Sequence, residues 1–225
     1  MVTKPTVLDS VKLENGTRRE RRREELRERI FQAAIRLFMQ QGFFNTTVEQ
    51  ITEAADVGKG TFFNYFDSKE HLVLKLTEAQ EAVLRNLTSQ LDSAGSVRAL
   101  LKTTQHQIAA GPGRSQLMLR SLLGCAYTND LVWERFKQLL ALARELIAQV
   151  MRRGQELGEI RVDIPPLELA RLYQQTVFGT NAIWSLHPPA NLDEWIDRTF
   201  DIFWRGIAAE AQTVPRAARP LSSSS

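Results

Sequence analysis

The side chains best suited to bind a charged partner are gathered near the start of the chain. Five of the six positions from residue 18 to residue 23 carry arginine. Such a run of guanidinium groups can bind phosphate even where the rest of the domain is nearly neutral. The alternative interpretation of the run is a solvated helix end whose arginines form ion pairs within the helix. A nucleic acid is therefore one candidate partner. The residues of the run are Arg18, Arg19, Arg21, Arg22 and Arg23.

Residues that could carry catalysis are few. The chain has three histidines, His71, His106 and His187, and a single cysteine, Cys125. Their spacing matches no metal site, nucleophile elbow or phosphate-binding loop. One cysteine forms no disulfide within the chain, which suits a reducing compartment. We therefore expect a protein that is not an enzyme and that holds no cofactor and no metal ion.

The composition predicts an all-α protein. Of the 225 residues, 43% are hydrophobic and 24% are charged, which is ordinary for a globular chain. Leucine and alanine far outnumber valine and isoleucine, and this favours helices over strands. The first residues lack the apolar core of a signal peptide, and no apolar run reaches the roughly 18 residues of a membrane span. We therefore expect a cytoplasmic protein with no membrane partner, and the net charge of +3 by itself identifies no partner.

Helix signals begin at the arginine run. Thr17 and Glu20 have the spacing of a capping box, which can start a helix. Apolar side chains then recur at intervals of three and four residues until Gly42, a typical helix stop. We expect the first helix to run from Thr17 to about Gln41, after a flexible tail over residues 1–16.

A second, short helix is signalled by two threonines. Thr46 and Thr47 form overlapping capping boxes with Glu49 and Gln50, respectively. An apolar face follows these boxes at helical spacing. The pattern predicts a helix of about two turns over residues 48–55.

A tight turn and another short helix come next. The sequence Asp56-Val57-Gly58 favours a turn because aspartate and glycine tolerate the left-handed backbone region. A short helix is then expected over about 59–65, and residues 67–70 would cap a longer helix that runs through Val83. Two short helices across a tight turn, held between longer helices, are typical of a helix-turn-helix.

Several short motifs follow one another in a fixed order between residues 41 and 70. They are Gln41-Gly42-Phe43, Thr46-Thr47-Val48, Val57-Gly58-Lys59-Gly60-Thr61, Tyr65-Phe66 and Ser68-Lys69-Glu70. Through these motifs, residues 30–74 resemble the DNA-binding domain of the TetR (tetracycline repressor) family. The resemblance implies that the short helix over 59–65 is a recognition helix for double-stranded DNA. Asp56 and Gly58 depart from the family, where glycine and serine or threonine are frequent, and this removes a side-chain cap.

The chemistry of this segment agrees with DNA contact. Lys59 and Lys69 suit phosphates, Gly60 lets the backbone approach a DNA strand, and Thr61 suits a base edge. Phe63 stands where family members commonly carry tyrosine, which leaves apolar contact in place of a hydrogen bond to phosphate. The expected DNA-binding residues are Thr46, Thr47, Lys59, Gly60, Thr61, Phe63, Asn64, Tyr65 and Lys69, together with an arm formed by Arg18, Arg19, Arg21, Arg22 and Arg23.

The remainder of the chain predicts further helices separated by short breaks. The fold class is all-α, with an N-terminal three-helix helix-turn-helix DNA-binding domain and a larger C-terminal helical domain for ligand binding and dimerisation. The expected helical segments are 78–92, 96–110, 114–127, 130–157, 166–186 and 192–208. The expected domains are a flexible tail over 1–16, the DNA-binding domain over 17–75, the effector-binding and dimerisation domain over 76–210 and a disordered tail over 211–225.

The last two helices are apolar on more than one side, and the resemblance implies that they pair with a second subunit. A well-packed monomer core is the alternative for these residues. The expected interface residues are Leu169, Val177, Trp184, Trp195, Phe200 and Phe203. The resemblance also implies an effector pocket, although each candidate could equally be an ordinary core or surface residue. The pocket candidates are Gln105, His106, Met118, Tyr127, Phe136, Tyr173, Gln174, Phe178 and Asn181.

These observations predict a ligand-responsive, sequence-specific transcriptional regulator. In the leading interpretation a homodimer represses from a near-palindromic operator and is released by an unidentified small-molecule effector. The alternative is a dimeric DNA-binding regulator without an effector, controlled by a protein partner or by its own abundance. A sizeable cavity lined by Met118, Tyr173 and Phe178 would favour the first interpretation, and a filled core would favour the second.

Overall fold

The computed structural model describes residues 18–91, 93, 95–110, 114–187 and 191–209. Within these ranges every regular element is a helix, apart from one isolated β-bridge between Ile160 and Ala208. The all-α expectation is therefore confirmed. The helices are α2 (Arg18–Gln41), α3 (Val48–Ala54), α4 (Lys59–Phe63), α5 (Glu70–Ser89), α6 (Val97–Ile108), α7 (Gln116–Thr128), α8 (Asp130–Glu156), α9 (Pro166–Leu186) and α10 (Leu192–Ile207).

Most predicted helix bounds agree closely with the structure. Helix α2 ends at Gln41 as expected, and Gly42 follows with a φ of +84°. The segment predicted over 78–92 is part of one continuous helix, α5. The tails predicted over 1–16 and 211–225, and the Thr17 cap, lie outside the described residues. Within them, no helix is both long and apolar enough to cross a membrane.

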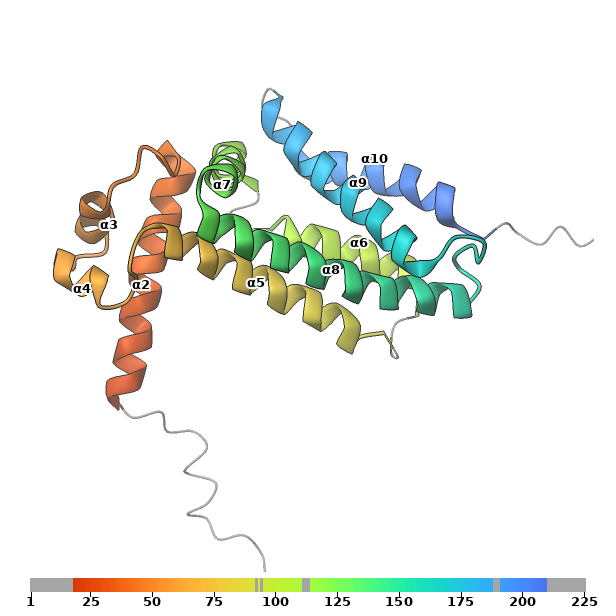
Figure 1. Cartoon of the computed structure of the whole chain (residues 1–225), viewed down its shortest axis with the longest axis horizontal. Helices are drawn as coiled ribbons and strands as arrows, with labels where there is room; N and C mark the ends of the chain where they lie inside the picture. Colours follow the sequence, from red (N-terminus) through yellow and green to blue (C-terminus); the bar gives the residue numbers. More distant parts are fainter. Residues whose placement is uncertain (1–17, 92, 94, 111–113, 188–190, 210–225) are drawn as a thin grey trace, which may run out of the picture.

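A small head is formed by α2, α3 and α4 at one end of the molecule (Figure 1). Its core contains the fully buried side chains of Phe38, Ile51 and Phe62, with Phe66 buried beside them. Phe62 and Phe66 thus pack against α2, because they share this cluster with Phe38. The head is therefore a three-helix unit whose apolar core is shared with residues of α5, α7 and α8.

Helix α5 connects the head to a larger body formed by α5–α10 (Figure 1). Leu72 near its start belongs to the head core, whereas Leu84 near its end belongs to the body core. The domain boundary expected after residue 75 therefore lies inside this helix. The expected side-chain cap of α5 is not made, because Ser68 and Asp67 both approach the His71 ring, at 3.3 and 3.5 Å.

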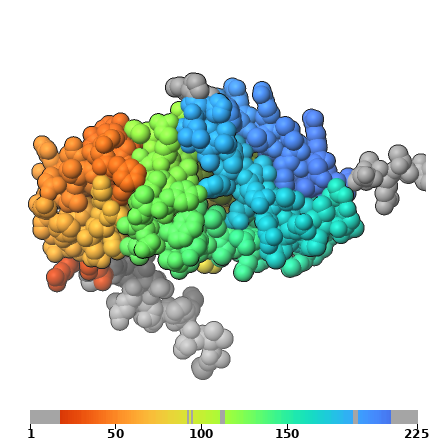
Figure 2. All heavy atoms as spheres, turned by 45° about the horizontal axis from the view of Figure 1, so that its top comes forward, coloured from red at the N-terminus to blue at the C-terminus, as the bar shows by residue number. Residues whose placement is uncertain are grey.

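Helix α7 forms a second connection between head and body, and Figure 2 shows its surface between the head and α9. The Phe43 N–H donates to the Ser121 hydroxyl at 3.1 Å. Gly124 lies against the Phe44 ring so closely that an added Cβ would stand 2.9 Å from it. Cys125 is buried in the same head cluster, and burial raises the pKa of its thiol to about 11. The head therefore rests on both α5 and α7.

Candidate nucleic-acid interface

The α3–turn–α4 unit is shaped by local bonds. The Thr47 hydroxyl accepts the Gln50 N–H at 3.2 Å, and the Gln50 side chain accepts the Thr47 N–H at 2.9 Å. This is the capping box that the sequence predicted for Thr47. Asp56 then adopts a φ of +50°, and Gly58 caps α4 without a side-chain bond. These features set the angle between the two short helices.

Thr46 differs from Thr47 although the sequence treated them alike. Its side chain is fully buried, and its hydroxyl donates to the Gly42 carbonyl at 2.8 Å. The predicted DNA contact of the Thr46 side chain is therefore wrong, because the hydroxyl closes the loop that follows α2. Of the two threonines, Thr47 is the one that remains exposed at the start of α3.

Lys69 also has internal partners that the sequence did not reveal. Its ammonium donates to the carbonyl oxygens of Phe43 and Thr46, each at 3.0 Å, and lies 4.4 Å from the centre of the Phe43 ring. The side chain thereby ties the start of α5 to the loop between α2 and α3. Two of its three N–H donors are used within the head.

Helix α4 presents an outward face beside its buried face. Lys59, Gly60, Phe63 and Asn64 are exposed and are separated by three or four positions, which places them on one side. Phe63 keeps 45% of its surface exposed, and a Cβ added at Gly60 would meet open space. Thr61 and Tyr65 are half-buried at the edges of this face. A partner can therefore approach the α4 backbone at Gly60.

Lys59 forms an ion pair with an acidic residue that the sequence pattern does not indicate as its partner. Its ammonium forms an ion pair with Glu49 on the first turn of α3. The hydrogen bond from Lys59 is the main cause that lowers the pKa of the Glu49 carboxyl. Glu49 had been assigned only to a possible cap with Thr46, and no local pattern links it to a residue ten positions away. The pair fixes the lysine at the edge of the outward face.

The arginine run is not an extended arm. Residues 18–23 form the first turns of α2, and all of their side chains are exposed. The helix expected from Thr17 thus includes the run, so the arginines belong to α2 and do not form a separate arm before it. A helix assigns each arginine to a definite face, since successive residues are about 100° apart.

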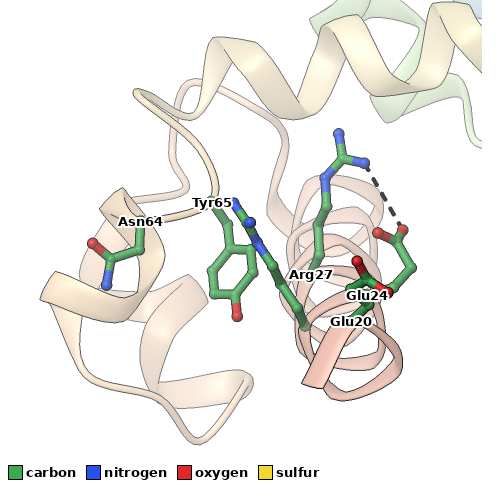
Figure 3. Close-up of a pocket in the computed structure, with 6 residues that line it drawn as sticks. Glu20, Glu24, Arg27, Asn64 and Tyr65 are labelled. Atoms are coloured by element: carbon green, nitrogen blue, oxygen red, sulfur yellow. Dashed lines mark ion pairs between the residues drawn. The ribbon is translucent and has the colours of Figure 1, made fainter. Parts of the chain in front are cut away.

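One face of these turns meets the end of α4. The Arg23 guanidinium lies 5.9 Å from the centre of the Tyr65 ring, and that of Arg27 lies 5.7 Å from the centre of the Phe66 ring. Figure 3 shows Tyr65 between Asn64 and α2, with the ion pair from Arg27 to Glu24. The hollow between the helices has a volume of about 460 Å³ and is lined by Glu20, Arg23, Glu24, Arg27, Asn64 and Tyr65.

Arg21 points elsewhere. It is about 160° around the helix from Arg23 and lines a separate surface hollow with Glu25 and Arg29. Arg29 also donates to the Asp56 carbonyl at 3.2 Å, which joins α2 to the turn before α4. The DNA-binding residues expected from the sequence do not include Arg27 or Arg29. Helical spacing would have indicated Arg27, because it is four positions after Arg23.

The residues proposed for an effector pocket lie in several separate places. Met118 belongs to the head core, whereas Tyr173 is buried in the body core and donates to the Leu101 carbonyl at 2.9 Å. Burial raises the pKa of the Tyr173 hydroxyl. Tyr127 is 70% exposed and Phe178 is 36% exposed. Among the described residues, Met118, Tyr173 and Phe178 therefore line no shared cavity, which is the observation that would have favoured control by an effector.

The other pocket candidates are also dispersed. Phe136 lies between Trp133 and Phe178 in a row of rings at the surface, with centres 6.4 and 6.1 Å away. Gln174 donates to the Leu140 carbonyl at 2.7 Å, and Asn181 donates to the Val177 carbonyl at 2.8 Å. His106 pairs with carboxylates of α10, and Gln105 is buried.

The structure corrects the expected interface on α9 and α10. Leu169, Trp184 and Phe200 are buried within the chain itself, because these positions face the body core rather than solvent. Val177, Phe203 and Trp195 are partly buried against the same clusters. The large apolar side chains that remain exposed on these helices are Leu167, Leu172, Phe178, Ile183, Leu186 and Ile202.

Comparisons with known proteins agree with this geometry. Residues 30–76 match the family model described as bacterial regulatory proteins, tetR family. The HTH-type transcriptional repressor DhaR of Mycobacterium sp. strain GP1 is 28% identical over 151 residues, which cover 66% of this chain and 76% of DhaR. The HTH-type transcriptional regulator UidR of Escherichia coli K12 is 26% identical over 157 residues, which cover 69% of this chain and 80% of UidR.

A solved structure extends the likeness over the body. FadR of Thermus thermophilus, a TetR-family transcriptional repressor in complex with lauroyl-CoA, superimposes with a TM-score of 0.59 and 25% identity. The match covers 84% of this chain and 98% of FadR. The likeness therefore includes the helical body as well as the head.

Proposed function

Because this chain belongs to the tetR family of bacterial regulatory proteins and is a transcriptional regulator of that family, we propose that it represses transcription as a homodimer on a near-palindromic operator. In this proposal a small-molecule effector releases the dimer from DNA. The observation that carries the proposal is the outward face of α4 beside the arginine-bearing turns of α2. A bacterial operator lies in the cytoplasm, so the protein acts there.

The outward face of α4 supports contact with the major groove. A helix fits that groove, and the bare backbone at Gly60 lets it approach closely. Lys59 is then near phosphate, while Thr61 and Phe63 face base edges and thymine methyl groups. Thr47, Asn64 and Tyr65 flank this contact.

The first turns of α2 support a second contact, with the flanking DNA backbone. Arg23 and Arg27 share the face that looks toward α4. Arg19 is four positions before Arg23 and continues this face outward. Guanidinium groups in a row can bind successive phosphates, or the narrow minor groove where arginine is favoured.

The outer surface of α9 and α10 supports a homodimer. Leu172, Ile183 and Ile202 are exposed there, and a Cβ added at Gly179 or Gly206 would meet open space. Glycine inside a helix costs about 1 kcal/mol relative to alanine. Two such glycines beside exposed apolar side chains suit the close approach of helices from a second copy.

Control by an effector is supported by likeness to a solved structure. FadR of Thermus thermophilus is in complex with lauroyl-CoA, and this likeness supports an effector site in the body of this chain. The separation of Met118, Tyr173 and Phe178 favours the alternative, in which a protein partner or abundance controls a regulator without an effector.

Selection of bound DNA from a random duplex library tests the proposal directly. The full-length protein should enrich a near-palindrome whose half-sites are spaced by one DNA turn or a multiple of it. Failure to enrich any near-palindromic sequence would contradict the proposed function. Compounds that release the protein from the selected DNA would then favour effector control over the alternative.

A further inference from the structure

Gln105 lies where the apolar interior of the body is divided into two clusters. Leu101, one turn earlier on α6, belongs to the larger cluster with Tyr173. Ala109, one turn later, belongs to the smaller cluster with Trp184. Gln105 itself is only 1% exposed. A primary amide therefore stands between two apolar regions and out of contact with bulk water.

Other polar side chains occur at the same level of the body. His106, the next residue on α6, bonds to Asp197 of α10 at 2.9 Å. Two residues further on α10, the Thr199 hydroxyl is 3.1 Å from that of Thr180 on α9. His106, next to Gln105, thus joins α6 to α10, and Thr199 joins α10 to α9.

The Gln105 amide differs from its polar neighbours because it has no hydrogen-bond partner. Neither Oε1 nor Nε2 is bonded within the part of the chain that the structure describes. Thr104, beside it, donates to the Leu100 carbonyl at 2.9 Å, and Thr180 donates to the Thr176 carbonyl at 2.7 Å. A buried donor and acceptor left unpaired destabilise the fold, so such groups normally have a partner.

We propose that Gln105 is the polar anchor of an effector site in the body. The effector is a neutral molecule that presents a hydrogen-bond acceptor and donor side by side, such as a carboxamide or a lactam, joined to an apolar group. The amide of Gln105 offers the matching donor and acceptor. This inference rests on the proposed control by an effector and names its chemical class.

The charges around this site argue for a neutral ligand. On the α10 side, Arg98 pairs with Asp201 at 2.9 Å, and Lys102 and His106 pair with Asp197 at 3.0 and 2.9 Å. The basic groups of α6 are therefore already matched by carboxylates at the surface. A charged ligand at Gln105 would lose its hydration without gaining a counterion.

The same ion pairs indicate how a ligand reaches a closed site. They join α6 to α10 along the surface beside Gln105, and their side chains remain between 29% and 49% exposed. Exposed ion pairs contribute little individually. The two helices can therefore part to admit a ligand without breaking a buried charge pair.

Stability provides a test that needs no ligand. Gln105→Met keeps the length of the side chain and removes the unpaired amide, so the thermal midpoint of the full-length protein should rise by about 2–4 °C. Gln107→Met, the same change at an exposed position of α6, should leave the midpoint unchanged. A lower midpoint for Gln105→Met would overturn the proposal, because the amide would then have a structural partner such as a buried water.

Binding of matched probes provides the second test. Acetamide, isobutyramide and benzamide are compared by calorimetry with acetone, 3-methylbutan-2-one and acetophenone, in which methyl replaces the amide NH₂. The wild type and Gln107→Met should bind at least one amide, and Gln105→Met should bind it about tenfold more weakly. Ketone binding should weaken less than amide binding in Gln105→Met, because a ketone keeps only the acceptor of the two hydrogen bonds.

Two results of the binding test would overturn the inference. One is that no amide binds the wild type, and the other is that Gln105→Met binds amides as well as the wild type does. Operator binding is measured on the same samples without probes. A protein that selects an operator but fails the amide test refutes only this inference, whereas failure to select any operator refutes the proposed function.

Discussion

The helical phase of the arginine run predicts that two neighbouring arginines contribute differently to DNA binding. Arg23 faces the end of α4, whereas Arg21 lies about 160° around α2 from it. We compare Arg23→Gln with Arg21→Gln. Glutamine and arginine have nearly equal helix propensity, so both variants keep the helix and each loses one charge per protomer.

The size of the effect follows from counterion release. Each lost phosphate contact lowers the slope of log affinity against log salt concentration by about 0.9. A dimer loses two contacts in Arg23→Gln, so the slope should fall by about 1.8. When the salt concentration rises from 0.05 to 0.2 M, the fold-loss of affinity should therefore be about twelve times smaller for the variant than for the wild type.

The assay is fluorescence anisotropy with the selected operator over this range of salt concentrations. Arg21→Gln should keep a slope within about 0.5 of the wild-type value. Equal slopes for the two variants would refute the assignment of faces, and an unchanged slope for Arg23→Gln would remove this face of α2 from the DNA interface. Thermal melting of both variants checks that the head remains folded.

Three further predictions concern α4, the α6–α10 ion pairs and the outer face of α9. Phe63→Ala should weaken operator binding by about 2 kcal/mol per protomer if DNA covers the exposed half of the ring. Replacing thymine with uracil in the half-site should weaken operator binding by the wild type but not by the variant. Equal losses of affinity in the two proteins would contradict contact with a thymine methyl group. Asp197→Asn should lower the free energy of unfolding in urea at pH 7, because the hydrogen bond from His106 and then that from Lys102 lower the pKa of this carboxyl in the folded state. The stabilisation by the Asp197 carboxylate is complete above the unfolded-state pKa near 3.8 and is lost as the pH falls through the lower folded-state pKa. A difference in unfolding free energy between wild type and Asp197→Asn that persists in stronger acid would contradict this prediction. Gly179→Leu should convert the dimer to a monomer in sedimentation experiments, whereas Glu145→Leu on α8 should not, and a persistent dimer would place the interface elsewhere.

Much of the head could be predicted from sequence because its signals are local. The Thr47 capping box, the left-handed turn at Asp56 and the stop at Gly42 each depend on residues within a few positions. Backbone geometry and hydrogen bonds at this range are properties of the segment itself.

The partners of individual polar groups could not be predicted in this way. Ser96 is the expected cap of the helix over 96–110, but its side chain makes no cap bond. The carboxylate of Glu159 instead accepts both the Ser96 hydroxyl, at 2.8 Å, and the Val97 N–H, at 2.9 Å. Lys69 likewise bonds to carbonyls 23 and 26 positions away. No periodic pattern contains such pairs, because only folding brings the segments together.

The sequence by itself determined the helical class, the turn between the two short helices and the family resemblance, since these depend on neighbouring residues. Only the tertiary structure decided which side chains are free. It buried Thr46, Leu169 and Phe200, left Phe63 exposed and left Gln105 without a partner among the described residues. The sequence of one helix can place apolar or charged side chains on several of its faces. The packing of helices distant in the sequence decides which of these faces stays exposed to bind DNA, a second copy or a ligand.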